Sequence, residues 1–271
     1  AVAGATACPE QAEAACPREA PVAVYCRPGR RSAEAAKALA KAGYAVCNLL
    51  GGIEGWQAAG KPVTKYAVET FFTGSGLPVR ITLIKHGTLE IVYKGLSIHI
   101  DPVSGLSIPT DYATEFPKAD VILVTHEHGD HFDRKALEAL GANADNLVTN
   151  ARVAEMLGWG AVMANGDSRE LPGDIHLDAV PAYNYSEGRT NFHPQGRDNG
   201  FILTLDGLRI YVAGDTEDIP EMADIKDIDV AFLPVNQPYT MTVDQCVHAA
   251  EVIQPKVLIP YHFSNTDLSA L

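Results

Sequence analysis

Several features that define other protein classes are scarce in this chain. Its 271 residues include five cysteines, which form no C-x-x-C pair and no zinc-finger spacing; they are Cys8, Cys16, Cys26, Cys47 and Cys246. An odd, scattered set of cysteines does not indicate a disulfide framework, so a reducing compartment, the cytoplasm, is the expected location. A Cys8–Cys16 disulfide remains an alternative to two free thiols. No apolar run approaches the roughly 18 residues that a membrane-spanning helix needs.

Basic residues are also in short supply, and they are unevenly distributed. The chain has 21 Lys and Arg against 34 Asp and Glu, which gives a net charge of −13. Residues 1–66 carry eight basic and five acidic side chains, whereas residues 67–271 carry thirteen and twenty-nine and hold all nine histidines. A surface this acidic has no basic patch to displace phosphate counterions, which argues against nucleic-acid and membrane partners. The expected partner is a small-molecule substrate, and a homo-oligomer is left open.

The first 64 residues have the pattern of a small α/β unit. The predicted elements are a strand over 22–25, a helix over 33–42, a strand over 45–49 and a short helix over 53–59. Ser32 can cap the first helix, and Gly43 can end it. This strand–helix–strand order is the fragment from which α/β sheets are built.

A different pattern follows a linker over 65–78, which contains Gly74, Gly76 and Pro78. Residues 79–271 alternate short β-type runs with helical segments, which predicts a second, larger α/β domain. The strands are predicted over 81–84, 89–93, 97–100, 121–124, 175–182, 200–205, 208–213, 230–234 and 257–260, and the helices over 135–140, 153–157 and 243–252.

Four potential metal ligands crowd into the segment Thr125-His126-Glu127-His128-Gly129-Asp130-His131, directly after an apolar strand. Imidazole and carboxylate groups suit zinc, and also manganese or iron. Four such groups on one loop would be costly to bury without a cation. On a loop at a strand end, residues 126 and 128 can point one way while 130 and 131 point another. This arrangement serves two adjacent ions better than one.

Three later residues, His193, Asp215 and His262, also lie at predicted strand ends. The ordered set H-x-H-x-D-H, then His, Gly-Asp and His, resembles the signature of the metallo-β-lactamase superfamily over roughly residues 79–271. The resemblance implies an αββα four-layer sandwich that holds two divalent ions. One ion would take His126, His128 and His193, the other would take Asp130, His131 and His262, and Asp215 would bridge them.

The same resemblance supplies expectations for the residues around the ligands. His86-Gly87-Thr88 and His99-Ile100-Asp101-Pro102 are similar to the first family motif, in which Asp101 would orient His126 or a neighbouring ligand. His86 is interpreted equally as a core or turn histidine and as a functional one. Loop residues that could contact a substrate are Asn191, Arg197, Asn236 and Tyr239.

A dinuclear hydrolase is the function that this resemblance implies. A hydroxide bridging two ions would attack a carbonyl or phosphoryl centre, with Asp130 orienting it as a catalytic residue. The segments Asp198–Phe201 and Ala213–Thr216 look most like the ascorbate-6-phosphate lactonase-type metal-dependent hydrolases. The expected substrate is therefore a small, anionic ester, lactone or phosphodiester, and zinc is the expected metal, with manganese and iron as alternatives.

The segment Cys26-Arg27-Pro28-Gly29-Arg30-Arg31-Ser32 places a thiol between a strand and a helix N-terminus. Backbone N–H groups, the helix dipole and the arginines would favour a reactive thiolate at Cys26, the second candidate catalytic residue. Residues 21–63 resemble the C-terminal half of a rhodanese domain, including the Gly-Gly-Ile…Gly-Trp ending. The first half of such a domain is not visible, so we interpret residues 1–64 as a partial rhodanese-like α/β unit.

Two other functions fit this combination of segments. A rhodanese-like unit fused to this fold is similar to persulfide dioxygenases, which use a single iron. Alternatively, the chain is a sulfur-carrier protein in which the metal-binding domain is a docking scaffold. Metal analysis and a sulfur-transfer assay that depends on Cys26 separate these alternatives from the hydrolase.

Overall fold

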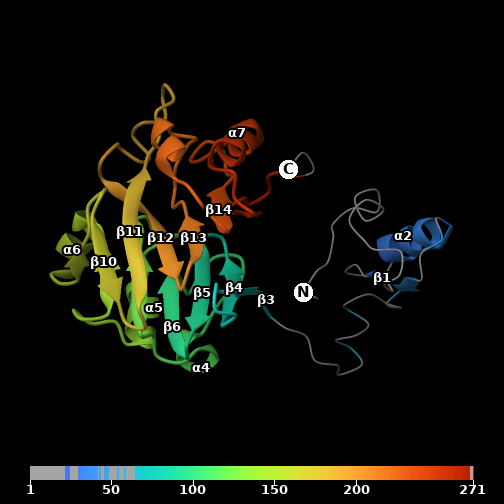
Figure 1. The fold of residues 1–271 in the computed structure, drawn as a ribbon, viewed down its shortest axis with the longest axis horizontal. Helices are drawn as coiled ribbons and strands as arrows, with labels where there is room; N and C mark the ends of the chain where they lie inside the picture. Colours follow the sequence, from blue (N-terminus) through green and yellow to red (C-terminus); the bar gives the residue numbers. More distant parts are fainter. Residues whose placement is uncertain are drawn as a thin grey trace. The chain divides into compact units, whose positions relative to one another are not determined.

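The chain divides into two compact units, Ala1–Ala67 and Val68–Leu271. The computed structural model describes residues 22–24, 30–41, 43, 46–48, 54, 58, 65–268 and 271 (Figure 1). Among these residues, none of the helices combines the length and apolar character that crossing a membrane requires.

The described part of the first unit is a strand–helix–strand fragment, as predicted. The strands β1 (Val22–Val24) and β2 (Val46–Asn48) pair in parallel, and the helix α2 (Arg30–Lys41) supplies the crossover that parallel pairing requires. The helix begins at Arg30 rather than Ala33, because arginine is a good helix former, and Ser32 therefore lies inside it. Cys26 lies outside the described residues, as does most of the short helix predicted over 53–59.

The first sheet of the second unit has seven strands in chain order. They are β3 (Ala67–Phe72), β4 (Pro78–Lys85), β5 (Thr88–Tyr93), β6 (Leu96–Ile100), β7 (Val121–Val124), β8 (Leu147–Thr149) and β9 (Ala161–Val162). The strands β4, β5 and β6 pair antiparallel, and β6 to β9 pair in parallel. The parallel strands are connected through α4 (Tyr112–Glu115), α5 (Arg134–Leu140) and α6 (Ala151–Leu157).

The second sheet has six strands, also in chain order. They are β10 (Ser168–Leu171), β11 (Ile175–Ala182), β12 (Asp198–Leu205), β13 (Leu208–Val212), β14 (Val230–Pro234) and β15 (Val257–Tyr261). The strands β10 to β13 pair antiparallel, and β13 to β15 pair in parallel. The connections of the parallel strands contain the 3₁₀ helix η1 (Pro220–Asp224) and the helix α7 (Val243–Ile253).

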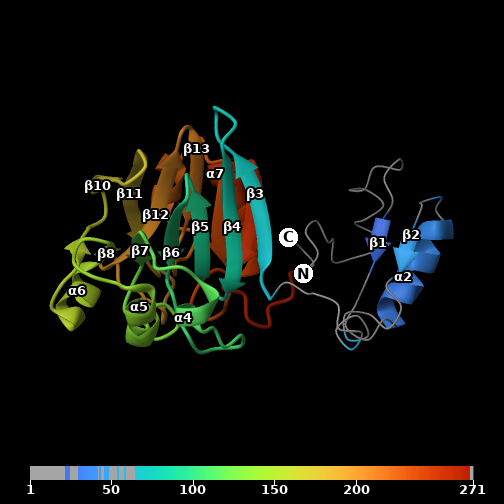
Figure 2. The same ribbon diagram turned by 90° about the horizontal axis from the view of Figure 1, so that it is seen from below.

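The two sheets share one apolar core, and helices cover their outer faces (Figure 2). Along β12, Phe201 and Leu203 face the shared core, while Ile202 belongs to a second apolar cluster with η1 and α7. The strand β7 is buried at all four positions because the shared core lies on one face and helices cover the other. This arrangement confirms the predicted αββα sandwich.

One strand lies where a linker was predicted. Residues 67–72 form β3, which adds to the edge of the first sheet, so the ordered sheet begins before residue 79. The segment has the β-branched and aromatic residues that favour strands, and Phe71 packs against the shared core. Gly74 and Gly76, which suggested a connector, instead form the turn between β3 and β4.

Candidate metal centre

Strand ends deliver the predicted ligands to one place. His126 lies two residues beyond β7, Asp215 lies three beyond β13, and His262 directly follows β15. His193 comes from the loop between β11 and β12. Because β13 and β15 run parallel to β14, their carboxyl ends reach the same edge of the second sheet, where ligands of open α/β sheets gather. All seven predicted ligands take part in the His and Asp clusters found here.

The carboxylate of Asp215 lies between two pairs of histidines. Its Oδ1 is 3.2 Å from Nε2 of His131 and 3.4 Å from Nε2 of His262. Its Oδ2 is 3.3 Å from Nε2 of His193 and 3.9 Å from Nε2 of His126. Each oxygen of this one side chain therefore faces its own pair of imidazole nitrogens.

The remaining ligands extend this division into two groups. The first group is His126, His128 and His193; the second group is His86, Asp130, His131 and His262. Within each group, the potential ligand atoms lie within 4.8 Å of one another. In the first group, Nε2 of His193 is 3.2 Å from Nδ1 of His128. In the second, Nε2 of His262 is 3.4 Å from Oδ2 of Asp130.

These separations suit metal coordination. Ligands at 2.0–2.1 Å from a tetrahedral zinc ion are about 3.4 Å from one another. Five of the six separations given above lie between 3.2 and 3.4 Å. These five pairs of donor atoms are thus already at the spacing of cation ligands.

Unpartnered buried atoms also point to a cation. Nε2 of His126, His131 and His262 and Oδ1 of Asp215 are buried and have no hydrogen-bond partner in the described part of the chain. Leaving such atoms unsatisfied costs free energy, and a cation would satisfy all four. The residues present therefore fit the metal ions that this kind of fold implies.

Neighbouring side chains fix which nitrogen of each imidazole faces the centre. Asp101 Oδ2 accepts a 2.7 Å hydrogen bond from Nδ1 of His131 and another from the hydroxyl of Thr125. The hydroxyl oxygen of Thr125 is 3.0 Å from Nδ1 of His126. Asp101 thus orients His131 directly and His126 through Thr125, and the Nε2 atoms are left free for a metal ion.

Asn184 plays the same part for His193, and no sequence motif indicates this role. Its Oδ1 accepts a 2.7 Å hydrogen bond from Nδ1 of His193, and its amide donates to the backbone oxygen of Tyr239. Asn184 is nine residues from His193 in a loop without a recognisable motif. A structure is needed to connect them.

Replacing Asn184 with Ala is therefore expected to weaken metal binding by the first group about 10- to 100-fold, the usual effect of losing an orienting partner. The measurement is a titration of the metal-free protein with zinc against a competing chelator. Asn165→Ala, which removes an amide bonded to β11 and β12 rather than to a candidate ligand, is the control. Equal zinc affinity in wild type and Asn184→Ala would contradict this role.

The electrostatics of the centre favour a cation. Burial alone would raise the pKa of Asp215, but the neighbouring His262 and His131 outweigh it and hold that pKa well below its usual range. Burial and the charge of His131 lower the pKa of His126 well below its ordinary value, which keeps the ring neutral. The pKa of His131 is raised despite burial, because Asp215 and Asp101 lie beside it. A bound cation would take the place of the His131 proton.

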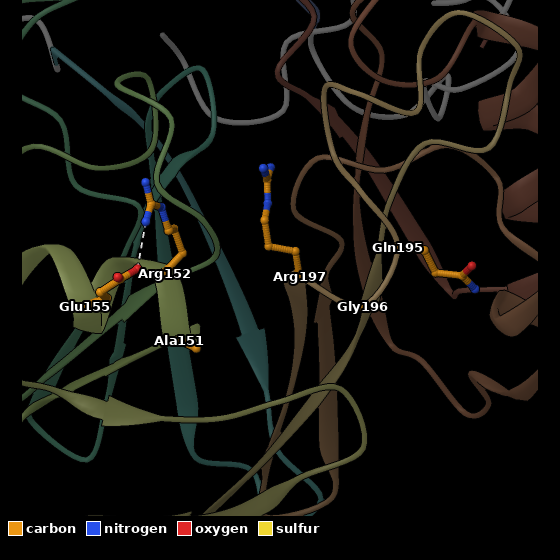
Figure 3. A pocket seen from close by; sticks show the side chains of 6 residues that line it. All are labelled: Ala151, Arg152, Glu155, Gln195, Gly196 and Arg197. Atoms are coloured by element: carbon orange, nitrogen blue, oxygen red, sulfur yellow. Dashed lines mark hydrogen bonds and ion pairs between the residues drawn. The ribbon is translucent and has the colours of Figure 1, made fainter.

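The predicted substrate contacts have more ordinary surroundings. Arg197 forms ion pairs with Glu127 and Asp198 and donates to the backbone oxygen of Phe192. It therefore connects the loops that carry His128 and His193, and its charge is already paired. It also lines an open cavity of about 600 Å³ with Ala151, Arg152, Glu155, Gln195 and Gly196 (Figure 3).

Tyr239 and Asn236 lie on one loop near the first group. Tyr239 is 44% exposed, and its ring packs edge-on against that of Phe192, next to His193, with the centroids 4.9 Å apart. The backbone of Asn236 is bonded to the Thr240 hydroxyl, which shapes the turn. Asn191 is exposed in the loop that carries His193. Of these residues, Tyr239 is the one whose exposed side chain packs against a neighbour of a candidate ligand, and all remain predicted substrate contacts.

Comparison with known proteins identifies the class. The family description "Beta-lactamase superfamily domain" matches residues 80–262, two-thirds of the chain. A crystal structure of a metal-dependent hydrolase from Parabacteroides distasonis is 53% identical, with a TM-score of 0.72 over 76% of this chain and 92% of that one. A metallo hydrolase from Ignicoccus hospitalis is 29% identical, with a TM-score of 0.57 over 68% and 82%. The predicted superfamily is confirmed.

The relatives among curated proteins define the family more narrowly. A UPF0173 metal-dependent hydrolase of Geobacillus sp. (strain WCH70) is 32% identical over 69% of this chain and 86% of its own length. One from Archaeoglobus fulgidus is 30% identical over 70% and 85%. The chain belongs to the UPF0173 metal-dependent hydrolase family and is a metal-dependent hydrolase of the metallo-β-lactamase superfamily.

The N-terminal unit has a match of its own. The description "Rhodanese-like domain" matches residues 3–59, which confirms the rhodanese-like prediction and extends it toward the N-terminus from residue 21.

Proposed function

We propose that the centre holds two divalent cations, one on each side of Asp215. The first group, His126, His128 and His193, would bind one ion; Asp130, His131 and His262 of the second group would bind the other. The observation that carries this proposal is the position of Asp215, whose Oδ1 and Oδ2 face different histidine pairs at 3.2–3.4 Å and 3.3–3.9 Å. A carboxylate placed in this way is suited to bridging.

The proposed reaction is hydrolysis of a small ester, lactone or phosphodiester. When bound, two such ions lower the pKa of a water molecule held between them and polarise the carbonyl or phosphoryl oxygen of a substrate. Asp215 would stay ionised, because the neighbouring His262 and His131 outweigh its burial and hold its pKa well below the usual range. The Asp130 side chain is 35% exposed, so it is the carboxylate of the centre that can orient water on the substrate side.

Two observations support an anionic substrate. The two ions would place positive charge at the centre, whereas the chain as a whole has a net charge of −13. A negative group on a substrate would therefore be attracted to the ions rather than to the acidic surface as a whole. In addition, the segments Asp198–Phe201 and Ala213–Thr216 resemble the ascorbate-6-phosphate lactonase-type enzymes, whose substrate is an anionic lactone. We propose zinc as the metal, because its ligands are imidazole and carboxylate at tetrahedral spacing. Manganese and iron are the alternatives.

Metal quantification followed by a substrate panel tests this proposal. The purified protein is expected to contain two zinc ions per chain and to hydrolyse an anionic lactone or phosphodiester. Neutral esters of the same size serve as the comparison. One iron per chain, together with oxygen uptake that depends on a persulfide, would overturn the proposal in favour of the dioxygenase.

The rhodanese-like match supports a second, separate activity. Cys26 lies between β1 and α2, where the loop of a rhodanese would hold a nucleophilic thiol, and residues 3–59 match that domain. We propose that the thiolate of Cys26 attacks the outer sulfur of thiosulfate to form a persulfide, while the S–S bond of thiosulfate breaks and sulfite leaves with its electron pair.

Cys26→Ser is accordingly expected to abolish transfer of sulfur from thiosulfate to cyanide, because serine cannot form a persulfide. The assay measures thiocyanate, and Cys47→Ser on β2 is the matched control. Lactone or phosphodiester hydrolysis should be unchanged in both variants. Equal thiocyanate formation by wild type and Cys26→Ser would contradict a role for this thiol.

A further inference from the structure

The turn between β4 and β5, His86-Gly87, contacts every other member of the second group. Nε2 of His86 is 3.0 Å from Oδ2 of Asp130. The backbone oxygen of His86 accepts a 3.0 Å hydrogen bond from the backbone N–H of His262, and the two imidazole rings lie with their centroids 3.6 Å apart. One residue therefore contacts Asp130 through its ring and His262 through both its ring and its backbone.

Gly87 brings this turn against His131. A Cβ atom at position 87 would lie 2.7 Å from Cε1 of the His131 ring, closer than real Cβ atoms approach other atoms. The side chain of His131 is fully buried and held on its far nitrogen by Asp101, so it has little freedom to move away. The turn therefore packs directly against the His131 ring and leaves no room for a side chain at position 87.

The chemistry of the contact defines the role of the His86 ring. An ionised carboxylate can only accept hydrogen bonds, so His86 must donate from Nε2 to Asp130. Asp130 needs such a donor more than the other ligands of its group, because its side chain is 35% exposed while His131 and His262 are 0% and 1% exposed. Without this hydrogen bond, its carboxylate could rotate toward solvent.

We infer that His86 is a positioning residue for the second ion: its Nε2–H holds Asp130, and its backbone oxygen holds His262, in the geometry that binds metal. This inference rests on the proposed two-ion function. It assigns His86 to the site as a hydrogen-bond donor rather than as a metal ligand, and it gives Gly87 the role of allowing close approach.

The test compares His86→Ala with His86→Gln. Glutamine places an amide N–H at about the position of Nε2, whereas alanine has no donor. The backbone at His86 has φ 45°, and both substitutes would have to adopt it, so any backbone strain is the same in the two variants. His248→Ala, which removes a surface histidine on α7, is the control. Metal-free proteins are titrated with zinc and with cobalt, and the readouts are ions bound per chain, the dissociation constant of each ion and the visible spectrum of bound cobalt.

His86→Ala is expected to bind the second ion about 10- to 100-fold more weakly and to lose one of the two cobalt absorption components, with the first ion unchanged. His86→Gln should restore both. Unchanged binding in His86→Ala would overturn the inference, and so would His86→Gln as weak as His86→Ala, since that result indicates direct ligation. Wild-type protein that binds a single ion would instead refute the two-ion function itself.

Discussion

Asp215→Asn is expected to lose both metal ions and to reduce hydrolysis by about 10³-fold or more. Asparagine keeps the shape of the side chain but removes its charge and leaves one oxygen, which can face one histidine pair and not both. Metal ions supply several kcal/mol of transition-state stabilisation, and each ~1.4 kcal/mol is a tenfold change in rate. The measurements are ions per chain and the initial rate on the best substrate of the panel.

A matched control separates this effect from a general loss of acidic charge. Asp174→Asn removes a carboxylate in the turn between β10 and β11. This side chain is exposed and pairs with Lys94 rather than with a residue of the centre. It should retain two ions and the wild-type rate. Asp215→Asn with normal metal content and a rate within a few-fold of wild type would contradict the bridging role.

His128→Ala is expected to have a smaller but still large effect, loss of the first ion with retention of the second. His128 contributes Nδ1 to the first group only, 3.2 Å from Nε2 of His193. Zinc content should fall from two ions to one per chain, and the rate by about 10²- to 10³-fold, because one ion alone cannot hold the nucleophile and polarise the substrate together.

Two comparisons make the His128 result specific. His248→Ala should leave zinc content and rate unchanged, because its imidazole pairs with Asp218 on the surface. The thermal unfolding midpoint of metal-free His128→Ala should match that of metal-free wild type, since His128 is only partly buried. Loss of both ions from His128→Ala would show that the two groups do not bind independently.

The sequence was sufficient for those parts of the centre that a short segment encodes. Four ligands are neighbours in the sequence: His126, His128, Asp130 and His131. The apolar strand β7 before them, which is covered on both faces, ends at the sheet edge and places their loop there. The later ligands could be predicted because Asp215 and His262 also follow strands of strong β pattern. The alternation of strands and helices predicted an α/β domain, and the αββα arrangement followed from the resemblance to the metallo-β-lactamase superfamily.

Contacts between distant segments could not be predicted in this way. His86 is 44 residues from Asp130, and although His86-Gly87-Thr88 resembles a family motif, that motif does not indicate that its turn closes on the second group. Arg197 stays a predicted substrate contact, and its ion pair with Glu127, 70 positions earlier, is a distant contact that the sequence does not indicate. The strand β3 was missed because nearby glycines suggested a connector, whereas pairing with β4 decides its structure.

The most direct test of the two-ion centre is a crystal structure of the zinc-loaded protein with anomalous diffraction measured on both sides of the zinc absorption edge. Two zinc peaks are expected, one between Oδ2 of Asp215 and the first group and the other between Oδ1 and the second group. A single peak, or peaks remote from Asp215, would contradict the account.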